Sequence, residues 1–72
     1  MTARIFPQSI EAERALLGGL ILDPDQIEDV TGLVSADDFA RPDHAALFEL
    51  IRGMRARGEK VDSITVPERV AR

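Results

Sequence analysis

The chain has 72 residues, of which 44% are hydrophobic and 31% charged, and its nine basic and thirteen acidic residues give a formal net charge of −4. This length allows one small domain, and the charged fraction excludes a membrane-embedded chain. There is no cysteine, which excludes a disulfide framework and a cysteine-based metal site. The acidic balance argues against a domain whose main task is to bind phosphates.

Residues 1–7 are predicted to form an N-terminal arm, and residues 8–72 a helical domain. Ser9 is a suitable N-cap for a first helix from Ile10 to Leu22. One face of this helix is apolar, and Glu13 lies in the middle of that face. The apolar residues of the face are Ile10, Leu16, Leu17, Leu20 and Ile21.

The opposite face of the first helix carries small residues, Ala12, Ala15 and Gly19. Two adjacent glycines, Gly18 and Gly19, each cost a helix about 1 kcal/mol relative to alanine. Close approach of another helix or subunit would explain this cost, and a tolerated weak point would explain it equally well. Ala12, Ala15 and Gly19 are therefore a candidate self-association strip.

After the first helix, residues 23–26 predict a turn that starts a second helix, with Asp23 as its N-cap and Gln26 as the reciprocal capping residue. Residues 35–38 are then predicted to form a short capped turn that carries Phe39 inward. The buried face of the second helix is expected to consist of Ile27, Val30, Leu33 and Val34.

Residues 42–57 are predicted to form the central helix of the domain. Pro42 suits its first turn, and Gly58 is a natural stop. At 100° per residue one arc of this helix is apolar, and His44 lies inside the arc. The apolar residues of the arc are Leu47, Phe48, Leu50, Ile51 and Met54.

The last segment is expected to contain a loop anchored by Val61 and Ile64, followed by a helix that the hydroxyl of Thr65 caps. This helix has barely begun at the last residue, so Val66 and Val70 are expected to be exposed or covered by another copy of the chain. The predicted fold class is all-α: a small orthogonal helical bundle of about four helices plus a short helical turn.

The sequence contains no glycine-rich phosphate loop, and a single histidine cannot form a zinc site. We therefore expect no catalytic, cofactor-binding or metal-binding residue. Glu13 and His44 are polar residues set among apolar ones, and a buried ionisable group needs a partner. We interpret them as structural partners across a helix interface rather than as a proton-transfer dyad, because no nucleophile or cleft accompanies them.

Several sequence segments occur in a recognisable order. PQSIEAE at residues 7–13 and LGGLILD at 17–23 precede DDF at 37–39. The later matching positions are His44, Phe48, Ile51, Gly58, Val61, Asp62 and Thr65. In this order they resemble the N-terminal domain of bacterial DnaB-type replicative DNA helicases. The chain departs from the family's pattern at Ala40, where the family often has an aromatic residue.

The resemblance implies a non-catalytic assembly and protein-interaction domain of a hexameric replicative helicase, which lies in the collar of the ring and contacts primase and the helicase loader. ATP and Mg²⁺ would bind only in a separate C-terminal motor domain. The chain would end before that domain and before the family's helical hairpin, and the protein would be cytoplasmic. The matching positions are implied to maintain the fold: Glu13, Leu17, Gly18, Phe39, His44, Phe48 and Asp62.

An alternative is a stand-alone small helical domain that binds nucleic acid or acts as an adaptor. Its basic surface would come from residues 52–60 or 67–72. The acidic total disfavours this alternative. Salt-dependent binding to duplex DNA discriminates between the two, because phosphate contacts release counterions.

Overall fold

The computed structural model describes residues 9–71, which form helices and no strand. The elements are α1 (Ile10–Leu22), the 3₁₀ turn η1 (Pro24–Gln26), α2 (Ile27–Thr31), the 3₁₀ turn η2 (Ala36–Asp38), α3 (Pro42–Ala56) and α4 (Thr65–Val70). The predicted all-α class is confirmed, and the first helix has the predicted bounds. The predicted arm at residues 1–7 lies outside the described residues.

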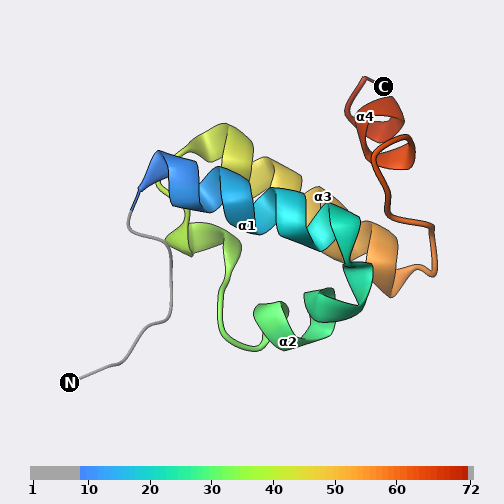
Figure 1. The fold of residues 1–72 in the computed structure, drawn as a ribbon, viewed down its shortest axis with the longest axis horizontal. Helices are drawn as coiled ribbons and strands as arrows, with labels where there is room; N and C mark the ends of the chain where they lie inside the picture. Colours follow the sequence, from blue (N-terminus) through green and yellow to red (C-terminus); the bar gives the residue numbers. More distant parts are fainter. Residues whose placement is uncertain (1–8, 72) are drawn as a thin grey trace.

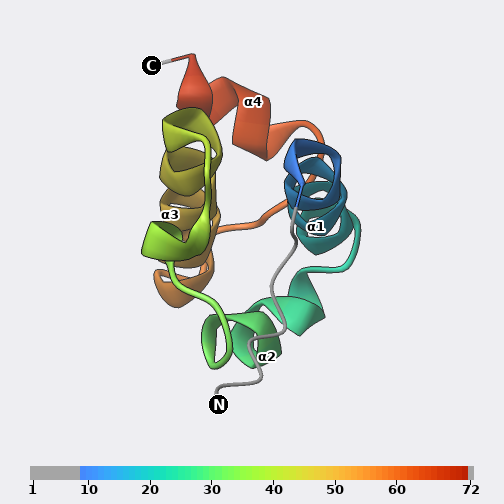
Figure 2. The same ribbon diagram turned by 90° about the vertical axis from the view of Figure 1, so that its left-hand side faces the viewer.

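Helices α1 and α3 run side by side and form the centre of the domain (Figure 1). In the perpendicular view, α2 lies on one side of this pair and α4 on the other (Figure 2). The Arg55 guanidinium fixes the end of α3 to the α2 side, because it bonds to Asp25 at 3.0 Å and to Glu28 at 2.9 Å. The two long helices, α1 and α3, therefore form a central platform, and the short helices α2 and α4 pack against opposite sides of it.

The core lies between these elements and is built from their apolar faces. Phe39 and Phe48 are in contact within it, with ring centroids 5.2 Å apart and a tilt of 37°, a favourable geometry for aromatic pairs. η2 thus carries Phe39 inward, as predicted. The buried apolar residues are Leu17, Leu20, Ile27, Val34, Phe39, Phe48, Ile51, Met54, Val61 and Val66.

The ends of the long helices follow from local sequence. The Ser9 hydroxyl accepts from the N–H of Ala12 at 3.0 Å and caps α1. Gly58 adopts φ +77, and the N–H of Glu59 donates to the carbonyl of Met54 at 2.8 Å. This pair of features is a Schellman ending, which satisfies the last carbonyls of α3 and turns the chain toward α4.

Three expectations for the loops and short helices are wrong. Leu33 is 64% exposed, because α2 ends at Thr31 and the chain beyond it buries Val34 in the core instead of Leu33. Ile64 is 68% exposed, so Val61 alone anchors its loop. Neither Asp23 nor Gln26 makes a side-chain capping bond, because the chain enters α2 through the tighter turn η1.

The start of α4 also differs from the prediction. Asp62, not Thr65, caps this helix: its carboxylate accepts from the N–H groups of Ile64 at 2.9 Å and Thr65 at 2.7 Å. The Thr65 hydroxyl accepts in return from the N–H of Asp62 at 3.0 Å. Val66 is buried, at 3% exposed, against the expectation, whereas Val70 is 61% exposed.

Candidate functional site

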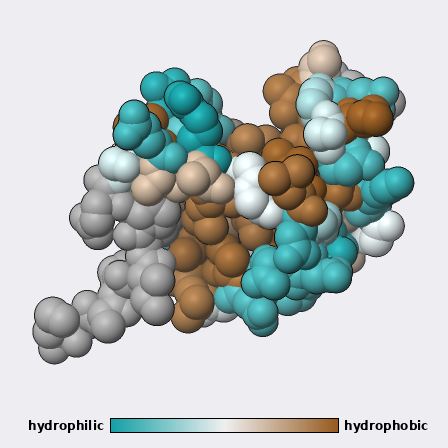
Figure 3. All heavy atoms as spheres, viewed as in Figure 1, coloured by the Kyte–Doolittle hydropathy of each residue, from teal (hydrophilic) through white to brown (hydrophobic). Residues whose placement is uncertain are grey.

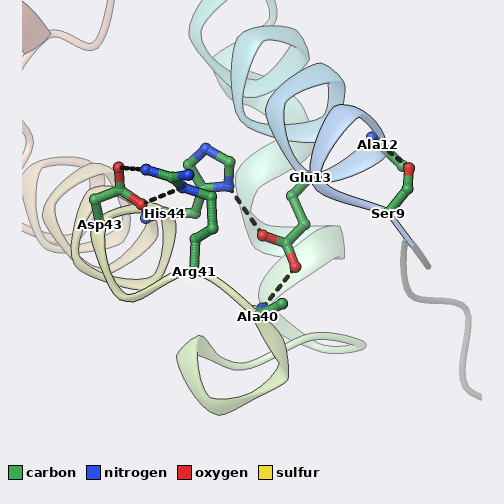
Figure 4. Close-up of polar contacts among 7 residues, drawn as sticks. All are labelled: Ser9, Ala12, Glu13, Ala40, Arg41, Asp43 and His44. Atoms are coloured by element: carbon green, nitrogen blue, oxygen red, sulfur yellow. Dashed lines mark hydrogen bonds and ion pairs between the residues drawn. The ribbon is translucent and has the colours of Figure 1, made fainter.

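Glu13 is the buried charged residue of the described chain, with 2% of its surface exposed. It sits on α1 and faces the start of α3, where its two oxygens are held separately (Figure 4). One accepts from the N–H of Ala40 at 2.6 Å, and the other contacts Nδ1 of His44 at 2.9 Å. We call Glu13, Ala40 and His44 the Glu13 latch, because they join α1 to the first turn of α3.

The latch keeps Glu13 ionised. Burial by itself would raise the pKa of this carboxyl, but the hydrogen bonds from Ala40 and His44 and the charge of His44 together lower the pKa below its ordinary value of 4.5. An ionised carboxylate only accepts hydrogen bonds, so Nδ1 of His44 must be the donor. The predicted partnership of Glu13 with His44 is thus present, and both carboxylate oxygens bond to groups of the fold.

The start of α3 carries a second charged pair beside the latch. Arg41 bonds to Asp43 through two nitrogens, each at 2.8 Å, and this contact lowers the pKa of Asp43 to about 2. Asp43 Oδ1 also accepts from the N–H of His44 at 2.9 Å. Since an acidic side chain near a helix N-terminus is favourable, the pair stabilises the same turn that the latch holds.

The other sequence-predicted fold residues do not gather at one place. Leu17, Phe39 and Phe48 are in the core, and Asp62 caps α4 at the far side of the domain. Gly18 is half-buried, and a Cβ added there would meet no atom within 4 Å beyond its own helical turns. These residues lie in separate parts of the fold and do not converge on one site.

The candidate self-association strip lies on the outer side of α1. Ala15 and Gly19 are exposed and line a shallow hollow toward Val30 of α2, while Ala12 is half-buried. A Cβ at Gly19 would meet no atom within 4 Å beyond its own helix. No described part of the chain therefore uses the glycines for close approach, and self-association through this strip stays a prediction.

A second surface feature was missed by sequence reasoning: an apolar groove between α3 and α4. It consists of two adjoining hollows that share Leu47 and Val70, and apolar surface dominates both. Figure 3 shows the hollow between the start of α3 and α4, with hydrophobic residues along its floor. We call this feature the α3–α4 groove. Its main lining residues are Ile21, His44, Leu47, Leu50, Val66 and Val70.

Neither feature carries a recognisable catalytic constellation. Within residues 9–71 no group of three or more histidine, cysteine, aspartate or glutamate side chains could hold a metal ion. In the described part, the partners of the Glu13 carboxylate are the N–H of Ala40 and Nδ1 of His44, and neither is a serine or threonine hydroxyl that could serve as a nucleophile. The described residues thus form the Glu13 latch and an exposed apolar groove.

None of the helices in the described segment has the length and apolar character needed to cross a bilayer.

Comparison with known proteins gives a consistent result. Residues 5–72 match the family model described as the DnaB-like helicase N terminal domain. The chain is 41% identical over 68 residues to the replicative DNA helicase DnaB of Geobacillus stearothermophilus, covering 94% of this chain and 15% of that protein. It is 40% identical over 60 residues to the replicative DNA helicase DnaB of Mycobacterium leprae, covering 83% of this chain and 10% of that protein.

A third relative, the replicative DNA helicase DnaB of Buchnera aphidicola subsp. Schizaphis graminum, is 40% identical over 65 residues, which are 90% of this chain and 14% of that protein. The chain thus spans about one seventh or less of the length of these relatives. No solved structure matches the chain.

Proposed function

Because the chain belongs to the family of DnaB-like helicase N-terminal domains, we propose that it serves as the non-catalytic assembly and protein-interaction domain of a replicative DNA helicase. The observation that carries the proposal is the family match over residues 5–72. The described residues support it by offering a rigid helical platform and a docking groove, with no cluster for chemistry.

In this proposal the complete protein is a cytoplasmic hexamer that unwinds DNA at the replication fork. This domain contributes to the collar of the ring and to contacts with primase and the helicase loader. ATP and Mg²⁺ bind in a separate C-terminal motor domain, and this domain binds no cofactor. The net charge of −4 supports a role in protein contacts rather than in holding the DNA backbone.

The test compares the 72-residue chain with the protein expressed from its complete reading frame. ATP hydrolysis should be stimulated by single-stranded DNA in the complete protein and be absent from the 72-residue chain. Both proteins should be assayed for duplex DNA binding over a range of salt concentrations. Hydrolysis by the 72-residue chain, or its own salt-dependent DNA binding, would contradict the proposal and favour the stand-alone nucleic-acid-binding alternative.

A further inference from the structure

We draw no further inference here: the strongest candidate, the outer face of α1 on which Ala15 and Gly19 line a shallow hollow toward α2, is a stripe of small residues, and nothing within residues 9–71 shows what covers it.

Discussion

At the scale of single residues, the domain depends on polar groups that each satisfy two or more partners. The Glu13 carboxylate serves both the backbone N–H of Ala40 and the ring of His44 from within the core. Asp62 serves two backbone N–H groups at the start of α4. In each case one side chain holds the first turn of a helix in place. Removal of that side chain should therefore destabilise the whole helix.

Glu13→Gln tests the latch. Glutamine can still accept from Ala40 or bond to His44, but it cannot offer two charged acceptors, so one buried bond is lost or weakened. We expect a melting temperature lower by roughly 5 °C or more. His44→Ala should act in the same direction. Thermal unfolding followed by circular dichroism checks both variants, and unchanged melting temperatures would contradict the latch.

The pH dependence of stability tests the carboxylate contacts together. The folded-state pKa values of Glu13 and Asp62 are lowered, and that of Asp43 is lowered to about 2. A lowered folded pKa means that the unfolded chain binds protons more readily, so these contacts stabilise the fold fully above about pH 5. Stability should fall as the pH drops from there toward 2. A melting temperature that stayed constant over this range would show that the contacts are absent in solution.

At the scale of elements, the short helix α4 depends on its cap. Asp62→Ala removes the carboxylate that accepts from Ile64 and Thr65, and it should lower the melting temperature by roughly 4–8 °C. Thr65→Val keeps the size of the side chain but removes the hydroxyl that bonds to Asp62 and Lys60, and it should cost less. If Thr65→Val proved the more damaging change, the assignment of the cap to Asp62 would be wrong.

The glycines of α1 allow a separate test of how closely this helix is packed. A Cβ at Gly19 meets no atom beyond its own helix, so Gly19→Ala should stabilise the isolated domain by about 1 kcal/mol. If the strip of Ala12, Ala15 and Gly19 also forms a subunit contact, the same variant should weaken self-association. Chemical denaturation and sedimentation measure the two effects on one sample. A loss of stability in the monomer would mean that Gly19 is packed more closely than the structure shows.

Sequence patterns predicted the long elements and failed at the short ones for a physical reason. The bounds of α1 follow from its Ser9 cap and its apolar face, because a helix of several turns repeats its pattern. The five residues of α2 make barely more than one turn. Leu33 lies beyond the end of this helix, so the helical periodicity that predicted it to be buried does not apply to it. At α4, Asp62 and Thr65 both carry capping oxygens, and only the fold decides which one the helix uses.

The candidate site was predictable in part. Glu13 and His44 stood out because each is polar within an apolar face, and the structure joins them. The α3–α4 groove could not be foreseen, because periodicity marks Leu47 and Leu50 as apolar without saying which element covers them. Their surroundings depend on how α4 is placed, and that placement arises from long-range packing of Val61 and Val66.

At the scale of the whole molecule, the platform of α1 and α3 carries two short helices and leaves a groove beside one of them. The residues that match the family's pattern are spread over this arrangement, in the core, in the Glu13 latch and at the start of α4. The proposed role as an assembly domain rests on the family match over residues 5–72. The proposed function therefore requires that this chain belongs to a longer helicase.

The intact mass of the protein purified from its source organism tests most directly whether this chain is part of a longer helicase. The account predicts a mass several times larger than the 7.9 kDa of this chain, with residues 1–72 at the head of the longer sequence. A natural protein of 7.9 kDa would contradict it and would identify a stand-alone domain of the same family, without a motor of its own.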